Sequence, residues 1–424
     1  MSAEQSTIKK DFFWNTVGSG IYALSSMFLA FAAMHIAGAD DGGIFGFGFS
    51  TFGQQMFIIA YFGIRPFHIT DSSYEYGYKD YRSSRRLTAL LAALAALLYL
   101  GFMHATGSYS LHKTAIVFLL ALYKTADGVA DLYESECQRC GKLWLGGKEL
   151  AIRTVLASAA LIVVMALTKN VLAACAAAVI TQYICIIVFK CYAEGHIFKI
   201  KQTKNGCFAL MRSTVLLFLS VFVDFYIFSA AKYAVDRYLT DAANGIFNIL
   251  FMPTSVIYLV ANFIIKPYMT RLSAIYELRR FDEFESVLKK LKLAVIALSA
   301  LAVAGTVVLG KPVLMILEYL LGAGFKGALS SKYLIFICII LGGCFYAVSN
   351  LYYYILIIMR RQKLIFAIYC IVAVIAFILS SLAVSRFGLT GAAIVYPCYM
   401  ALATACFAIS CRRLLNAAKR KNYE

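Results

Sequence analysis

Four charged side chains interrupt an apolar run at about residues 114–134, where charge is costly. The four are Lys124, Asp127, Asp131 and Glu134. At 100° per residue they fall within an arc of 80° on one helix. Facing lipid, they would together cost on the order of 10 kcal/mol, so we expect them to face protein or water. This pattern suits either a structural ion pair of Lys124 with Asp127 or direct contact with an anionic ligand or a coupling ion, and the sequence leaves both open.

Polar stripes, each on one helical face, also run along four other apolar segments. Their members include Asn15, Gln54, Arg65, Asp224, Asn248 and Asn262. Small polar residues hold helices together in lipid, so packing is the simpler explanation for any one stripe. Because all four segments carry a stripe, we expect them to line a shared wet cavity.

Two basic residues, Arg65 and Lys266, end two of these segments in matching sequences. A guanidinium fork suits a diphosphate, whereas a cation at a helix end is also typical of topological anchoring. Arg65 continues the polar stripe of its own segment, which favours it as an anion ligand. Pro253 lies in the middle of the segment that Lys266 ends and removes a backbone donor, so we expect a kink or a hinge there.

Membrane-crossing helices must position these residues. Of the 424 residues, 62% are hydrophobic and only 15% are charged, which excludes a cytosolic enzyme and a disordered chain. A bilayer core of about 30 Å needs roughly 20 apolar residues per helix. Twelve runs meet this need, at about residues 12–37, 44–64, 87–106, 114–134, 149–168, 171–190, 208–231, 244–265, 291–310, 331–359, 364–385 and 391–411. We therefore predict an all-α polytopic membrane protein.

Membrane topology accounts for most of the net charge of +18, so nucleic acid is not an expected partner. Segments on one side of the predicted membrane, including 65–86 and 139–153, hold 31 of the 40 Lys and Arg residues, against 8 on the other side. This asymmetry places both termini in the cytoplasm. Lys124 is then the one cation that topology does not explain.

Features of an ATPase, a metalloprotein or an enzyme are not expected. No sequence of the G-x-x-x-x-G-K-[ST] type is present, so we expect no use of ATP. Cys137 and Cys140 form a lone C-x-x-C pair without a second ligand pair, so we expect no metal site and no other cofactor. The connecting loops are too short for a folded catalytic domain.

An internal repeat relates the two halves of the chain. Gly43-Ile44-Phe45 recurs as Gly245-Ile246-Phe247, and Ile64-Arg65-Pro66-Phe67 recurs as Ile265-Lys266-Pro267-Tyr268. The offsets of 202 and 201 residues predict two parallel six-helix bundles, 1–204 and 205–424, with a central cleft between them. Transporters bind their substrates in clefts of this kind.

Four motifs resemble those of the polysaccharide branch of the multidrug/oligosaccharidyl-lipid/polysaccharide flippase superfamily. The segment 65–71 is similar to the family pattern Arg-x-aromatic-Gln-x-Thr-Asp, with His68 where Gln is usual. The segment 123–131 matches Tyr-Lys-x-x-Asp-x-x-x-Asp. The segment 232–236 is similar to a Pro-Lys-Tyr-x-x-Asp element but lacks the proline, and the segment 247–253 matches the signature of the eighth span.

The resemblance implies a flippase that moves a polyprenyl-diphosphate-linked oligosaccharide across the bacterial plasma membrane by alternating access, for cell-surface polysaccharide assembly. For such a substrate, the expected contacts come from the charged segment, the polar stripes and the basic helix ends described above: Arg65, Lys124, Gln54, Asn15, Asn248, Asn262 and Lys266. The implied carriers of a coupling proton or sodium ion, or of balancing charge, are Asp71, Asp127, Asp131, Glu134 and Asp224. Pro253 is the expected hinge, and His68 is a residue that can titrate near neutral pH.

Two rival functions remain from the sequence. A cation-coupled multidrug exporter shares the plan of two six-helix bundles, although the basic residues named above fit a cationic substrate poorly. A membrane polysaccharide polymerase or glycosyltransferase would need a large outer loop or a cytoplasmic domain, and the chain has room for neither.

Overall fold

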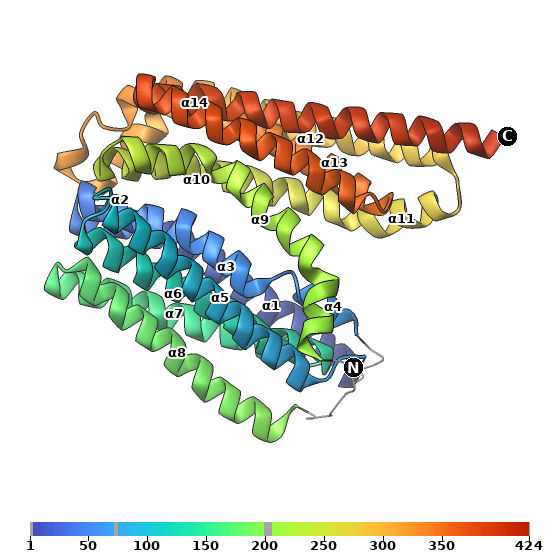
Figure 1. Cartoon of the computed structure of the whole chain (residues 1–424), viewed down its shortest axis with the longest axis horizontal. Coiled ribbons are helices and arrows are strands. Elements are labelled where there is room, and N and C mark those ends of the chain that lie inside the picture. Colours follow the sequence, from blue (N-terminus) through green and yellow to red (C-terminus); the bar gives the residue numbers. More distant parts are fainter. Residues whose placement is uncertain (1–2, 72–74, 199–205, 424) are drawn as a thin grey trace. The chain divides into compact units, whose positions relative to one another are not determined.

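The computed structural model describes residues 3–71, 75–198 and 206–423, and these residues form helices without any strand (Figure 1). The chain divides into two compact units, Met1–Phe222 and Val223–Glu424. The division falls within one long helix, α9 (Cys207–Tyr238). The expected boundary between residues 204 and 205 lies outside the described residues and stays a prediction.

Unit 1 is built around α6 (Leu111–Arg139), which packs against α3, α5, α7 and α8. The other elements of this unit are α1 (Ala3–Ala37), α2 (Ala39–Phe47), the π-helix η1 (Gly48–Phe52), α3 (Gly53–Tyr61), α4 (Arg65–Thr70), α5 (Tyr78–Ala105), α7 (Leu143–Thr168), α8 (Val171–His196) and the first part of α9. Because four helices surround α6, its side chains meet protein on most sides, as the charges at its centre require.

Unit 2 contains the end of α9 and the remaining helices. They are α10 (Asp241–Ile265), η2 (Lys266–Tyr268), α11 (Met269–Glu277), α12 (Phe281–Leu321), η3 (Ala323–Phe325), η4 (Ser330–Lys332), α13 (Tyr333–Ile358) and α14 (Gln362–Tyr423). Pro253 lies inside α10, which stays helical on both sides of it. Its role as a moving hinge remains a prediction.

Twelve membrane passes are present in the described residues, although only nine stretches meet a simple criterion of length and hydropathy. The tenth is α6, which carries the charged cluster, and the eleventh is α2–η1–α3, which the π-helix divides. The twelfth comes from α14, where Gly388 has a φ of 57°. The rings of Tyr369 and Phe407, 38 residues apart, have centroids only 5.1 Å apart, so α14 folds back on itself as two antiparallel helices. The predicted fold class is confirmed.

The two units repeat the same order of elements. In unit 1, the pass α2–η1–α3 is followed by the short helix α4, and in unit 2 the pass α10 is followed by η2 and α11. Pro66 and Pro267 occupy the first turns of α4 and η2, where a missing backbone N–H costs nothing. The matching prolines therefore mark matching helix starts, which confirms the internal repeat.

Close backbone packing joins α1 to α7 in unit 1. An added Cβ at Gly147 would lie 2.5 Å from the carbonyl oxygen of Trp14, and one at Gly18 would meet the carbonyl of Gly147. Small residues at a crossing allow two membrane helices to approach closely and gain van der Waals contact. This contact helps fix α7, and with it Arg153, beside α6.

Candidate functional site

Lys124 and Asp127, the first two charged residues of the cluster on α6, contact Tyr22 on α1. The ammonium of Lys124 donates to the hydroxyl of Tyr22 at 3.2 Å and lies 3.7 Å from Asp127, with only 2% of Lys124 exposed. It also lies 4.0 Å from the ring centroid of Phe49, a cation–π contact. The hydroxyl of Tyr22 in turn donates to Asp127 at 3.0 Å. The predicted pair of Lys124 and Asp127 is therefore present, with a tyrosine bridging it.

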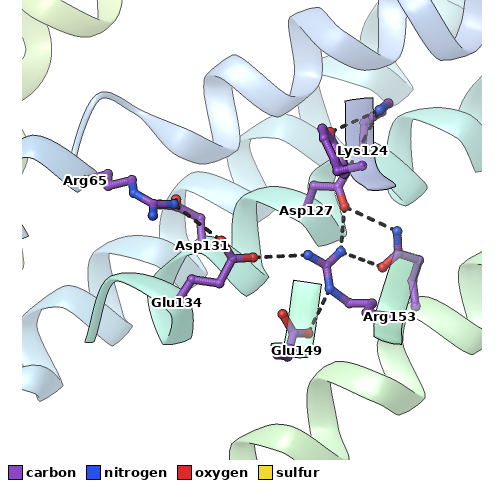
Figure 2. Close-up of polar contacts among 9 residues, drawn as sticks. Arg65, Lys124, Asp127, Asp131, Glu134, Glu149 and Arg153 are labelled. Carbon is purple, nitrogen blue, oxygen red and sulfur yellow. Dashed lines mark hydrogen bonds and ion pairs between the residues drawn. The ribbon is translucent and has the colours of Figure 1, made fainter. Parts of the chain in front are cut away.

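A buried arginine on α7 neutralises the carboxylates at the centre of α6. Arg153 donates to Asp127 at 2.6 Å, to Glu149 at 2.8 Å and to Glu134 at 3.2 Å. It also donates to the side-chain oxygen of Gln182 at 2.7 Å. Figure 2 shows its guanidinium pointing into this ring of acceptors. All three of its nitrogens are used, so Arg153 is a structural hub that joins α6, α7 and α8.

A second pair of arginines neutralises Asp131. Arg65 donates to one carboxylate oxygen at 2.6 Å, and Arg85 donates to the other at 2.7 Å. Arg85 also donates to the backbone carbonyls of Ala60 and Tyr61, at the end of α3. Arg65 reaches Glu134 as well, at 3.4 Å. Asp131 thus fixes the position of Arg65, which lies at the start of α4.

These contacts form one continuous ion-pair network. Its members are Arg65, Arg85, Lys124 and Arg153 with Asp127, Asp131, Glu134 and Glu149. Four formal positive charges balance four formal negative charges. A network of this composition tolerates burial because each charge keeps a partner, and the addition or removal of one charge disturbs all of it. Arg65 is the most open member, with 28% of its side chain exposed.

A second polar cluster lies next to the network, where α4 contacts the carboxyl-terminal end of α6. His68 contacts Glu136 at 2.6 Å and stacks on Tyr81, with ring centroids 3.9 Å apart. Arg139 lies 2.7 Å from Glu136 and 3.7 Å from Asp71. α4 lies outside the membrane-spanning segments, and burial there lowers the pKa of His68 against the opposing effect of Glu136. His68 is therefore neutral at pH 7, and the expected titration near neutrality is displaced to lower pH.

Asp71, directly after α4, accepts hydrogen bonds from three residues further along the chain. Burial alone would raise the pKa of Asp71, but backbone N–H groups of Tyr76 and Glu75 donate to its carboxylate at 3.0 and 2.8 Å and hold that pKa below its usual value. The hydroxyl of Tyr81 also donates to it, at 3.1 Å. This carboxylate is thus engaged by three donors, while its proposed role in ion coupling stays a prediction.

Polar residues of unit 2 form hydrogen bonds in place of the ion pairs of unit 1. Asp224 on α9 accepts from the hydroxyl of Tyr346 on α13 at 2.9 Å. Asn262 accepts from Asn350 and from Tyr354, both at 3.2 Å. Asn248 donates to Asn244 one helical turn earlier, at 3.0 Å. The α13 side chains that meet these residues carry no formal charge, so the two units differ in chemistry although their elements correspond.

Three predicted substrate residues lie apart from these clusters. Asn15 and Lys266 are exposed, and Gln54 is half-buried. Within the described part of the chain, their side chains make no hydrogen bond or ion pair with the network. Nor do the described residues contain a group of three or more His, Cys, Asp or Glu side chains placed to hold a metal ion.

Comparison with known proteins identifies the fold. No protein-family model and no curated protein sequence matches the chain. Among solved structures, it is similar to a lipid II flippase, MurJ, in an inward closed conformation, with a TM-score of 0.68, 13% identity and coverage of 94% of this chain and 87% of the other. It is also similar to an inward-facing multidrug resistance MATE family transporter of the MOP superfamily, with a TM-score of 0.64, 12% identity and 96% coverage of both chains. A Vibrio cholerae MATE transporter, VcmN in the bent form, matches with a TM-score of 0.59, 13% identity and 98% coverage of both chains.

The chain has the fold of the MOP exporters. This superfamily includes the multidrug and flippase branches, so the resemblance inferred from the sequence motifs is confirmed at the level of fold. At identities of 12–13%, these similarities show the shared fold alone. The transported compound has to be inferred from the chain's own residues.

Within this exporter fold, the network contains two arginines whose charge membrane topology was expected to explain. Arg85 and Arg153 were counted among the cytoplasmic cations of segments 65–86 and 139–153, but each is only 1% exposed and pairs with a carboxylate of α6. The prediction that Lys124 is the one cation not explained by membrane topology is therefore wrong. Because α5 begins at Tyr78 and α7 at Leu143, both arginines lie inside helices. The unpartnered carboxylates of α6 were the available signal, since buried charges require partners.

Proposed function

We propose that the chain flips a polyprenyl-diphosphate-linked oligosaccharide across the bacterial plasma membrane by alternating access, for cell-surface polysaccharide assembly. The sequence motifs support this substrate class, and similarity to a protein described as a lipid II flippase supports the reaction type. The excess of Lys and Arg on one side of the predicted membrane supports a cytoplasmic location for both termini.

The proposal rests on the contacts and the exposure of Arg65. Of its three nitrogens, Nη1 contacts Asp131 and Glu134, while Nη2 and Nε have no partner among the described residues. The side chain is also partly exposed, so a ligand can reach it. A planar pair of N–H donors matches two oxygens of a phosphate. Asp131 thus holds one edge of the guanidinium and presents the other edge to an anion.

Binding of a diphosphate at Arg65 would change the balance of the network. The contact of Arg65 with Glu134 is long, at 3.4 Å, and an added phosphate competes for the same guanidinium. When Arg65 turns to the ligand, Glu134 loses one of its two arginine partners. It then relies on its contact with Arg153, at 3.2 Å, or it takes up a cation or a proton. Because a ligand shifts a conformational equilibrium only through different affinities for its states, this exchange of partners is a plausible source of that difference.

Lys124 has a different place in the proposal. Its ammonium is buried and already contacts Tyr22 and Asp127. Direct contact with substrate therefore requires another conformation, in which α1 and α6 separate at Tyr22. In the conformation described, Lys124 balances the charge of Asp127, and its role as an anion ligand stays a prediction.

Reconstitution in vesicles with a labelled lipid-linked oligosaccharide tests the proposal. Arg65→Ala should lower the initial flipping rate by at least tenfold, because a charge-assisted bidentate contact is worth about 1.5–3 kcal/mol. Arg65→Lys is the matched control, which keeps the charge and removes the fork, and it should lie between the alanine variant and the parent. Lys124→Ala should also lower the rate. If Arg65→Ala and Lys124→Ala both flip at the parental rate, the site is wrongly assigned.

A cation-coupled multidrug exporter is the second candidate, favoured by the MATE transporters among the similar structures. The four carboxylates of the network also suit a cation, although each is already paired with an arginine or a lysine. Drug accumulation in a host that lacks its own exporters separates the two functions. Reduced accumulation that depends on Asp127 or Asp131, without flipping of the oligosaccharide lipid, would favour the exporter.

A further inference from the structure

A groove of about 450 Å³ lies in unit 1 between α5, α6 and α8. Most of its lining is apolar, from Ala89, Leu90, Ala93, Leu122, Val129 and Leu132. Leu90 is 68% exposed and Leu94, one turn further along α5, is 51% exposed. Exposed leucines on a membrane helix meet hydrocarbon, so the groove opens toward lipid chains.

Basic residues gather at one end of this groove only. Arg82 and Arg86 line it near the start of α5, which begins at Tyr78. Arg86 is exposed, and no carboxylate in the described part of the chain pairs with it. Arg82 contacts Glu194 at 3.0 Å and keeps 26% of its side chain exposed. An apolar groove with a basic end matches an anionic lipid, which has an apolar acyl chain and a negatively charged phosphate.

Two buried polar atoms on the groove's lining lack partners. Thr125 is 2% exposed, and its Oγ1 makes no hydrogen bond to any described residue. Arg85 also lines the groove, and its Nε is likewise without an acceptor in the described residues, although both of its Nη atoms are bonded. Buried donors without acceptors are destabilising, so a ligand that supplied acceptors here would be bound favourably.

We propose that this groove binds an anionic phospholipid of the inner leaflet, with its phosphate at Arg82 and Arg86 and one acyl chain along α5 and α6. Basic pockets between membrane helices on the cytoplasmic side bind phosphate head groups in this way. From Arg82 to Ala93 the groove follows eleven residues of helix, or about 16 Å. This is half of a bilayer core of about 30 Å, so the groove fits a chain confined to one leaflet better than a polyprenyl chain, which is much longer.

The lipid site communicates with the network through Arg85. Its Nη2 donates to Asp131 at 2.7 Å, and Asp131 accepts from Arg65 at 2.6 Å on its other oxygen. A phosphate near Arg86 adds negative charge beside Arg85 and competes with Asp131 for that arginine. Lipid bound in the groove thereby alters how firmly Asp131 holds Arg65. This effect depends on the geometry of unit 1 alone, and it holds whichever compound the chain transports.

Lipid binding to the full-length chain in detergent tests the proposal, with native mass spectrometry counting bound molecules. Dioleoyl phosphatidylglycerol should bind at least tenfold more tightly than dioleoyl phosphatidylcholine. Arg86→Ala should weaken phosphatidylglycerol binding about tenfold, as expected for loss of one charge-assisted contact. Ala89→Leu, which fills the groove without changing charge, should weaken both lipids.

Matched controls separate a defined groove from general surface charge. Lys79→Ala removes an exposed cation from the same end of α5, outside the groove lining, and should leave binding unchanged. Gly101→Leu adds the same kind of bulk to α5 where nothing lies within 4 Å, and it should also bind like the parent. Equal losses in Arg86→Ala and Lys79→Ala would overturn the proposal, as would equal affinity for the two phospholipids. Displacement of phosphatidylglycerol by equimolar undecaprenyl phosphate would overturn it in favour of the transported carrier lipid.

Discussion

The guanidinium of Arg153 on α7 lies 2.6 Å from a carboxylate oxygen of Asp127 on α6, and both side chains are buried. The same guanidinium also contacts Glu134 and Glu149. A single cation therefore serves three carboxylates within the membrane. Because the remaining cations of the network lie on other helices, none can replace it without movement of the backbone.

Arg153→Met should destabilise the chain severely. The change leaves three carboxylates with one cation fewer, and breaking a buried ion pair from one side costs about 3–5 kcal/mol. The unfolding midpoint of the purified chain in detergent measures the loss. Lys148→Met removes an exposed cation from the same helix and is the control. Adding Asp127→Asn to Arg153→Met should recover part of the loss, and a double variant no more stable than the single one would contradict this account.

His68→Gln should change the pH dependence of stability more than stability itself. Glutamine keeps an N–H donor for Glu136, which His68 now contacts at 2.6 Å. Burial places the pKa of His68 below its unfolded value of about 6.5, so the unfolded chain binds more protons and stability falls as the pH drops through that value. The parent should therefore lose stability between about pH 7 and pH 5, and the variant should lose less.

Unfolding midpoints recorded across this pH range test the role of His68. At pH 7.5, where the histidine is neutral in both states, the two proteins should unfold at similar temperatures. Parallel curves over the whole range would show that His68 makes no contribution to the acid response. A flipping rate whose dependence between pH 5 and pH 7 disappears in His68→Gln would show that this residue titrates functionally.

The sequence predicted that the charged residues of α6 share one face of the helix, but it did not predict which residues of other helices contact that face. Helical spacing fixes the direction of each α6 side chain, and this was enough to place Lys124 and Asp127 together. The partners lie on α1, α5 and α7, and contacts between distant helices have no signature in local spacing. Only the packed structure shows that the hydroxyl of Tyr22 on α1 bridges Lys124 and Asp127.

Helix ends were underestimated for a physical reason. A run was ended where charged residues began, on the premise that lipid excludes charge. α5 nevertheless begins before its predicted run of 87–106, at Tyr78, because Arg85 finds a carboxylate on α6 and need not reach water. In contrast, the repeated prolines 66 and 267 did mark matching positions in the two halves, since each lies in the first turn of a short helix, where proline is favoured.

Gly147→Ala should destabilise the contact of α1 with α7. The added Cβ would lie 2.5 Å from a backbone carbonyl of Trp14, which cannot move away as a side chain can. Overpacking of this kind costs about 1–3 kcal/mol, and displacement of α7 would also move Arg153 from α6. Gly195→Ala is the control, because Gly195 is helical and has no neighbouring atom within 4 Å of an added Cβ. Equal unfolding midpoints for the two variants would show that the helices adjust without cost.

Asp224→Asn should remove the response of transport to an ion gradient. Asp224 accepts from Tyr346 at 2.9 Å, but no lysine or arginine in the described residues pairs with it, unlike the four carboxylates of the network. A carboxylate inside a membrane protein without a cationic side chain requires a proton or a metal cation to balance it. Such a cation is exchangeable, whereas the arginines that balance Asp127 and Asp131 are covalently part of the chain. Asparagine keeps the acceptor for Tyr346 and removes the charge.

Flipping in vesicles with an imposed proton or sodium gradient measures this response. The parent should flip faster in one gradient than without it, and Asp224→Asn should flip at the same rate in both conditions. Glu277→Gln removes a largely exposed carboxylate from unit 2 and should keep the parental response. An unchanged gradient response in Asp224→Asn would transfer the coupling role to the network of unit 1. There, uptake of a cation must break an existing ion pair, and the cost of breaking it would then be part of the transport cycle.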